Sequence, residues 1–340
     1  MKVAVLGLGF MGTTHVKAWH RVAGAVLAAV ESRDSRKLEG DFAGVAGNLG
    51  GASERVDLAG ISKYGEIEPL LEDPEIEAVD VCLPTYLHES VAIQALRAGK
   101  HVLVEKPMAL DEQAAERMID EAARANRVLM TAHVLRFLPE YTALRDVVHG
   151  GTAGSLRHAE FRRRCAAPGW AEWMLDPAKS GGGAFDLLIH DADLCLHLFG
   201  PPVKISATGY VDHSVGIDCL AADLFYGDGG VVSIAGGWRQ PGSYPFSMEY
   251  TVTLEGGTVE YSSAGRTPHW YGRDGSHRAL KLDEQDGYVA ELAYFAQCCR
   301  TRRDPALCPA LESAAAVKLM RLVLKSRRES GARMKYDLTL

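Results

Sequence analysis

Short apolar runs alternate with longer amphipathic segments over the first 130 residues. The apolar runs lie at 3–6, 25–30, 67–71, 79–83, 101–104 and 128–131, and helical patterns lie at 13–22, 89–98 and 111–125. This alternation predicts a parallel sheet with helices on both faces. The segment 41–60 is rich in Gly, Ala and Ser, which predicts a loop or frayed helix at the surface.

A different pattern begins near residue 155. Short segments at 157–164, 203–211, 219–226, 230–238, 248–255 and 258–261 follow one another with turn residues between them, which is typical of a mainly antiparallel sheet. Helical patterns return at 287–302 and 309–329. We predict an α/β protein with a doubly wound parallel sheet over 1–131 and an α+β domain with a large antiparallel sheet over 132–340. The last helices are candidates for packing back on the first domain.

Length and charge narrow the class of protein. The chain has 340 residues, of which 47% are hydrophobic and 24% charged, with a formal net charge of −7. An acidic balance argues against nucleic acid as a partner, and no apolar stretch approaches the ~20 residues that span a bilayer. The seven cysteines lack the paired spacing of a zinc or redox site. We expect a cytoplasmic protein with reduced thiols that binds neither nucleic acid nor membrane.

A glycine-rich turn follows the first predicted strand. Gly7, Gly9 and Gly12 form a GxGxxG pattern between an apolar strand and a helical pattern. In that context the glycines allow a tight turn, a close approach of backbone to a pyrophosphate, and close packing of helix on strand. The helix N-terminus offers N–H groups to the anion. We predict a dinucleotide site formed by these glycines with Phe10 and Met11; a glycine-rich turn without a ligand is the alternative.

The end of the second predicted strand bears on the choice of dinucleotide. A carboxylate at Glu31 that accepts from the ribose hydroxyls favours NAD(H), whereas donation from Ser32 and Arg33 to a 2′-phosphate favours NADP(H). Arg36 and Lys37 add cations nearby, and the planar arginine side chain matches phosphate well. We therefore predict NADP(H) as the cofactor with Ser32 and Arg33 as ligands, and keep NAD(H) as the alternative.

Three further segments, taken in order along the chain, resemble those of one family. They are Pro84-Thr85-Tyr86-Leu87-His88, Glu105-Lys106-Pro107, and the run from Gly181 through Asp186 and His190 to Asp193. From Lys2 to about Tyr336 the chain resembles the glucose-fructose oxidoreductase, inositol dehydrogenase and MocA family (Gfo/Idh/MocA). The resemblance implies an N-terminal Rossmann domain, a C-terminal domain whose open sheet forms a homodimer or homotetramer, and NAD(P)-linked chemistry on sugars and polyols.

The resemblance also implies roles for single residues. Lys106, Asp186 and His190 match the catalytic positions of the family, and Asp193 matches an acidic position that faces the substrate. Residues at the ends of the predicted strands 79–83 and 101–104, and just after them, are predicted to contact the cofactor. They are Leu83, Pro84, Thr85, His88, Glu105 and Lys106. Lys106 is predicted to contact the substrate as well.

Hydride transfer from a secondary alcohol needs these same residue types. A base must take the hydroxyl proton, and a cation or donor must stabilise charge on the oxygen. His190 suits the base, Lys106 the cation, and Asp186 at i, i−4 can tune either one. Taken singly, His190 is more simply explained as a packed core histidine, and Glu105 and Lys106 as a surface ion pair.

Two other features bear on the ligand. His190, Asp193 and His197 have a spacing that could present metal ligands on one helical face, but a nicotinamide dehydrogenase needs no metal and we predict none. His133 and Arg136, in a segment resembling the family's Arg-Phe-x-Pro-x-Tyr, are candidate substrate residues together with Trp170.

The predicted function is therefore that of an NAD(P)-dependent oxidoreductase acting on a sugar or an inositol-like polyol. An NAD-dependent glycosidase of the same fold and a non-catalytic cofactor-binding protein are the alternatives. The stereochemistry of the substrate depends on a few hydrogen bonds in a loop-built pocket, which the sequence does not specify.

Overall fold

The chain folds into two compact units. The computed structural model describes residues 1–45, 47 and 55–337. Met1–Val134 and Asp286–Ala314 form the first unit, and Leu135–Gln285 and Ala315–Leu340 form the second. The first unit thus continues slightly beyond the predicted boundary at 131 and takes in a later segment of the chain.

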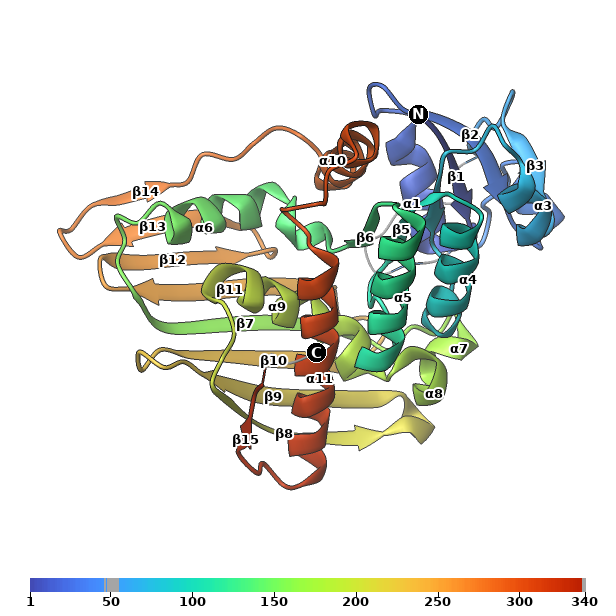
Figure 1. The fold of residues 1–340 in the computed structure, drawn as a ribbon. Coiled ribbons are helices and arrows are strands. Elements are labelled where there is room, and N and C mark those ends of the chain that lie inside the picture. Colours follow the sequence, from blue (N-terminus) through green and yellow to red (C-terminus); the bar gives the residue numbers. More distant parts are fainter. Residues whose placement is uncertain (46, 48–54, 338–340) are drawn as a thin grey trace. The chain divides into compact units, whose positions relative to one another are not determined.

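The first unit is built on a six-stranded sheet in the order β3-β2-β1-β4-β5-β6, with every pair parallel (Figure 1). Its strands are β1 (Lys2–Leu6), β2 (Val26–Glu31), β3 (Ser62–Tyr64), β4 (Ala78–Val81), β5 (His101–Glu105) and β6 (Leu129–Ala132). Its helices are α1 (Phe10–Trp19), α2 (Ser35–Leu38), α3 (Ile67–Glu72), α4 (Thr85–Arg97), α5 (Glu112–Ala125) and α10 (Gly287–Thr301). The central strands are almost wholly buried, as expected when helices cover both faces.

Side-chain caps fix the start of several of these helices. Asp111 accepts a hydrogen bond from the Ala114 amide at the start of α5, and Asp286 accepts one from the Tyr288 amide at the start of α10. Asn126 ends α5 in the left-handed conformation, with φ of 51°. These local signals set both ends of α5 and the start of α10.

The second unit is built on a nine-stranded sheet in the order β14-β13-β12-β11-β7-β10-β9-β8-β15. Its strands are β7 (Leu156–Ala166), β8 (Lys204–Asp212), β9 (Ile217–Phe225), β10 (Val231–Gln240), β11 (Ser247–Leu254), β12 (Gly257–Ser262), β13 (Arg266–Gly272), β14 (His277–Ala279) and β15 (Met334–Lys335). Its helices are α6 (Pro139–His149), α7 (Glu172–Leu175), α8 (Pro177–Ser180) and α9 (Gly183–Phe199), together with most of α11 (Ala310–Arg328). Short 3-10 turns lie at η1 (Val134–Arg136) and η2 (His213–Val215).

Helix α9 packs on β7, β9 and β10 at the centre of this sheet. Helix α11 is tied to β8, because the Ser326 hydroxyl accepts a hydrogen bond of 2.8 Å from the Ala207 amide. The predicted association of subunits through this sheet stays a prediction. Among the described residues, none of the helices has the length and apolar character needed to cross a membrane.

The predicted fold class is confirmed, with four refinements. The second sheet is mixed, since β7 and β10 pair in parallel while its other pairs are antiparallel. The apolar run at 67–71 is helix α3 and not a strand, and the nearby strand is β3. Helix α6 and strands β13 and β14 were not predicted; the two strands are mostly exposed, so burial imposes little apolar alternation on them. Of the predicted loop at 41–60, residues 46 and 48–54 lie outside the described residues, and Asp41 and Arg55 form an isolated bridge.

Candidate functional site

The carboxyl ends of β1, β4 and β5 lie side by side in the first sheet, and the glycine-rich turn follows β1. Gly7 has φ of +86°, a region that glycine enters without strain. A Cβ on Gly12 would lie 1.8 Å from the Gly7 carbonyl oxygen, so α1 can pack on the turn only with glycine there. The geometry agrees with the tasks predicted for Gly7 and Gly12.

The N-terminus of α1 opens directly from this turn. Gly9 is the N-cap residue and has no side chain to cap the first N–H groups, while Phe10 and Met11 open the helix and are partly buried. The first turn contains no acidic residue. This backbone is open at Gly9, where an added Cβ would meet nothing within 4 Å and would take up space beside the helix N-terminus, so it fits the pyrophosphate of a dinucleotide.

Glu31, Ser32 and Arg33, the candidate ligands of the adenosine ribose or its 2′-phosphate, lie at the end of β2. Glu31 is 3% exposed, and its Oε2 has no hydrogen-bond partner within the described part of the chain. Burial raises the pKa of Glu31, and nearby Arg33 opposes the rise. Arg33 is exposed, and the Ser32 hydroxyl accepts from the Asp34 amide at 3.1 Å. Arg36 turns to Asp34, with Nη2 3.1 Å from Oδ2.

His88 links the segments that follow β4 and β5. Its Nδ1 is 2.8 Å from the Pro107 carbonyl oxygen, and its Nε2 is 2.8 Å from the Leu83 carbonyl oxygen. Burial lowers the pKa of His88, and the two carbonyl contacts oppose that shift. The side chain is 1% exposed, so the geometry favours an indirect role in which His88 holds these two backbone segments in place. Pro84 and Thr85 open α4 on the same side of the sheet.

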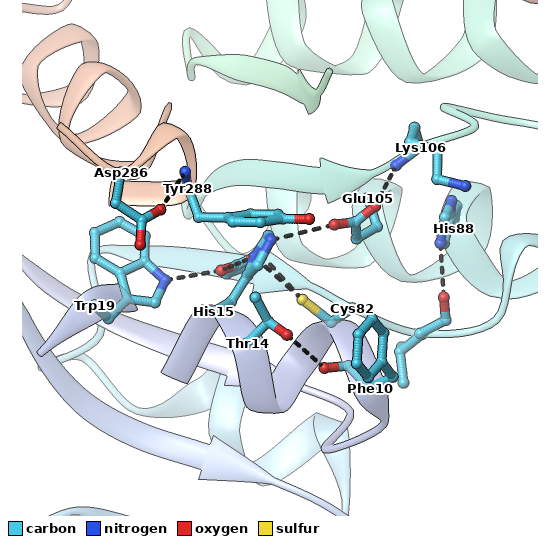
Figure 2. Close-up of polar contacts among 12 residues, drawn as sticks. Phe10, Thr14, His15, Trp19, Cys82, His88, Glu105, Lys106, Asp286 and Tyr288 are labelled. Atoms are coloured by element: carbon cyan, nitrogen blue, oxygen red, sulfur yellow. Dashed lines mark hydrogen bonds and ion pairs between the residues drawn. The ribbon is translucent and has the colours of Figure 1, made fainter. Parts of the chain in front are cut away.

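Glu105 and Lys106 stand at the end of β5. Glu105 is 6% exposed, and its Oε2 accepts a hydrogen bond of 2.9 Å from the Lys106 amide. Lys106 itself is partly exposed. Figure 2 shows both residues near His88 and beside α1, which carries Phe10 and His15. The first unit therefore brings together the predicted glycine turn and the predicted catalytic lysine.

A buried polar group beneath Glu105 was missed by the sequence reasoning. His15, Asp80 and Cys82 have ligand atoms within 4.8 Å of one another, and they form the only group of three or more potential metal ligands within the described residues. Asp80 is a carboxylate in the otherwise apolar strand β4, which was the one signal that could have found it. His190, Asp193 and His197, whose spacing could present metal ligands although no metal was predicted there, are not among the ligand groups of the same described residues.

In the second unit, the glycine run at 181–183 sets the start of α9. Gly181 and Gly182 have φ of +81° and +90°, and a Cβ on Gly183 would lie 2.3 Å from the Trp238 ring. Asp218 accepts a hydrogen bond of 3.1 Å from the Ala184 amide and so caps the helix. A tightly packed, capped helix start gives the residues that follow it a fixed direction.

Asp186 and His190 lie on the first turns of α9, so the predicted i, i+4 spacing on one face of a helix holds. Asp186 is 7% exposed, and His190 is partly exposed. Both belong to the second unit, whereas Lys106 belongs to the first.

Asp193 and Arg136 are brought together in a buried ion pair. Arg136 is 2% exposed and Asp193 is fully buried, and two hydrogen bonds of 2.7 and 2.8 Å join them. Arg136 also lies 3.3 Å from the Nδ1 atom of His197. The other two candidate substrate residues differ from each other: His133 is 1% exposed at the end of β6, and Trp170 is 42% exposed before α7.

A parallel sheet with a glycine turn and an open helix N-terminus at the carboxyl end of its first strand defines a dinucleotide-binding domain, and Lys106 follows β5 at the same edge of this sheet. Residues 1–133 match the model of the oxidoreductase family with an NAD-binding Rossmann fold, and residues 141–260 match the GFO/IDH/MocA C-terminal domain. The chain belongs to the Gfo/Idh/MocA family of oxidoreductases.

Similar proteins agree with this assignment. The chain is 27% identical over 320 residues to myo-inositol 2-dehydrogenase of Thermotoga maritima, covering 90% of each chain. It is 35% identical over 192 residues to trans-1,2-dihydrobenzene-1,2-diol dehydrogenase of Mus musculus, covering 55% of this chain and 56% of the mouse protein. The structure of an aldose-aldose oxidoreductase of Caulobacter crescentus complexed with glycerol shares the fold, with a TM-score of 0.83 at 23% identity over 98% of this chain and 99% of the other.

Proposed function

We propose that the protein is an NAD(P)-dependent dehydrogenase or reductase that acts on a secondary alcohol of a sugar or an inositol-like polyol. The observation that carries this proposal is the position of Lys106, at the carboxyl end of β5 in the same unit as the glycine turn. The relatives named as inositol and diol dehydrogenases support the substrate class.

In the proposed mechanism, one set of residues binds the dinucleotide and another set acts on the substrate hydroxyl group. The glycine turn and the first turn of α1 hold the dinucleotide, which when bound supplies or accepts the hydride. The Lys106 ammonium donates to the substrate oxygen and stabilises the negative charge that develops there. His190 takes the hydroxyl proton during oxidation and returns it during reduction, and Asp186, one turn earlier on α9, orients or tunes the imidazole.

The remaining candidate residues receive different roles. Trp170 offers an exposed indole on which a sugar ring could stack. The hydrogen bonds of Arg136 and Asp193 to each other favour a structural role, in which the pair fixes α9 against the segment that opens the second unit. His133 is buried at the end of β6, so we propose that it supports the site from within the first unit.

A cofactor-reduction screen tests the function. The protein is mixed with NADP or NAD and with a panel of inositols, aldoses, uronates and amino sugars, and absorbance of the reduced nicotinamide is followed. We expect net reduction with at least one polyol or sugar. Product release from glycosides without net reduction supports the NAD-dependent glycosidase instead, and cofactor binding without turnover on any compound supports a non-catalytic binding protein.

Titrations of the two dinucleotides test the proposed preference for NADP(H). Arg33 and Arg36 are both exposed after β2, and the guanidinium of Arg36 is paired with Asp34. We expect Arg33→Ala to weaken NADP binding by about 10–100-fold, the equivalent of one charge-assisted phosphate contact, and to leave NAD binding nearly unchanged. Arg36→Ala is the matched control. The buried, unpartnered Oε2 of Glu31 supports the alternative, so tighter binding of NAD with no effect of Arg33→Ala on NADP assigns the ribose to Glu31.

A further inference from the structure

A line of buried polar side chains runs beneath the proposed catalytic lysine. His15 on α1 and Asp80 on β4 are fully buried, and Glu105 at the end of β5 is 6% exposed. Trp19 on α1 and Tyr288 on α10 enclose them, with the Tyr288 ring centre 6.2 Å from that of His15. Figure 2 shows this group between α1 and the end of β5. Buried charges on this scale are unusual in the core of a parallel sheet and call for an explanation.

The contacts form one continuous chain. Asp80 Oδ2 lies 2.8 Å from His15 Nδ1 and also accepts a 2.8 Å hydrogen bond from the Trp19 indole N–H. On the other side of the ring, His15 Nε2 lies 3.2 Å from Glu105 Oε1. The second oxygen of Glu105 accepts from the Lys106 amide at 2.9 Å. Fixed groups therefore connect Asp80 to the backbone of Lys106.

Both ring nitrogens of His15 face carboxylate oxygens, which accept and do not donate. The arrangement therefore favours an imidazolium whose Nδ1 donates to Asp80 and whose Nε2 makes an ion-pair contact with Glu105 without hydrogen-bond geometry. Burial opposes the charge, but the Asp80 carboxylate outweighs it and holds the pKa of His15 well above 6.5. The groups that face the ring are Asp80, Cys82, Glu105 and Tyr288, and Trp19 donates to Asp80.

The same atoms are poorly spaced for a metal ion. Two ligands of a tetrahedral zinc at about 2.0–2.1 Å would be ~3.3 Å apart, whereas His15 Nδ1 and Asp80 Oδ2 are 2.8 Å apart, as in a hydrogen bond. Burial raises the pKa of the Cys82 thiol, and nearby Asp80 adds to the rise, so Cys82 stays protonated and can donate to Asp80 Oδ1 at 3.4 Å.

We propose that Asp80, His15 and Glu105 form a positioning relay that fixes the backbone of Lys106 and so aims its ammonium at the substrate oxygen. The proposal rests on the proposed function, because it gives His15 and Asp80 a role in the same reaction. Catalysis is sensitive to the placement of a reacting group at the level of about 1 Å. His15 and Asp80 touch neither substrate nor cofactor in this scheme and are positioning residues.

Two substitutions separate the relay from simple packing. The amide nitrogen of asparagine at position 15 lies near the place of Nδ1 and keeps the donor to Asp80. That of glutamine lies near the place of Nε2 and keeps a polar N–H group beside Glu105, at the position of the native ion-pair contact. We expect His15→Asn to lower kcat by about 10–100-fold and His15→Gln to retain more of the activity, with KM for the cofactor unchanged in both. His20→Asn, at the exposed end of the same helix, is the matched control.

A second measurement does not depend on turnover. We expect the ring nitrogens of His15 to show the imidazolium signature in ¹⁵N NMR spectra at pH 7.5, and Asp80→Asn to bring its titration back towards the ordinary pKa. Because the folded state binds this proton more tightly than the unfolded chain, the charge stabilises the fold fully below about pH 6.5 and loses that effect as the pH rises towards the folded-state pKa.

The results of these experiments show whether the positioning relay or the proposed dehydrogenase function is wrong. Equal losses of kcat in His15→Asn and His15→Gln that follow their losses of stability, or a neutral His15 at pH 7.5, overturn the relay and leave the function of Lys106 standing. An inactive wild-type protein with a charged His15 overturns the proposed function and the catalytic part of the relay, while the imidazolium bridge between the two carboxylates stands.

Discussion

Replacement of Lys106 by alanine is expected to lower kcat by about 10²–10⁴-fold, the effect of removing a proton-transfer or charge-stabilising group from a transition state. Cofactor affinity is expected to change by no more than about threefold, since the glycine turn and the start of α1 supply the main contacts to the pyrophosphate. His190→Ala is expected to lower kcat by a similar factor, because no other group is proposed to take the hydroxyl proton. Steady-state kinetics and fluorescence titration of the cofactor measure the two effects separately.

The controls distinguish a specific role from loss of charge. Lys63→Ala removes a lysine from β3 that pairs with Glu39 at 3.0 Å, and it should leave kcat unchanged. Lys106→Arg keeps the positive charge but alters the reach and geometry of the donor, so it should recover only part of the activity. Full activity of Lys106→Ala or His190→Ala on a substrate that the wild-type protein oxidises would contradict the assignment of that residue.

The parts of the site that the sequence predicted are the parts encoded locally. Gly7 and Gly12 lie five residues apart and meet within one strand-turn-helix unit, so their spacing contains the whole signal. Asp186 and His190 share a helical face for the same reason. Lys106 follows a strand whose apolar run was readable, and the carboxyl ends of parallel strands meet at one edge of a sheet.

The parts that the sequence did not predict depend on distant residues. The imidazole of His15 meets a carboxylate 65 positions away, at Asp80, and Arg136 meets Asp193 57 positions away. No periodic pattern relates such pairs, and a buried aspartate in a strand or helix has the same sequence signature whether it binds a ligand or an arginine. The spacing of His190, Asp193 and His197 is compatible with metal ligands on one helical face. It does not show that Asp193 pairs with Arg136, which is distant in the sequence.

The pairing of Asp193 leads to the second large effect. Asp193→Asn would leave the Arg136 guanidinium buried without its carboxylate, and breaking a buried ion pair in this way costs about 3–5 kcal/mol of stability. The side chains of the two residues are 1% and 0% exposed, so solvent screens the pair very little. We expect a correspondingly lower midpoint in urea unfolding, measured in the absence of substrate and cofactor.

Two further variants test whether the stability lost in Asp193→Asn comes from breaking the buried ion pair. Asp146→Asn removes a carboxylate that is 69% exposed and pairs with Arg145, so it is expected to cost no more than about 1 kcal/mol. The double variant Arg136→Met with Asp193→Leu removes both charges and is expected to recover most of the stability, because well-packed apolar side chains can replace a buried ion pair. If Asp193 instead serves mainly as a substrate ligand, Asp193→Asn will raise KM for the substrate at nearly unchanged stability, and the double variant will recover nothing.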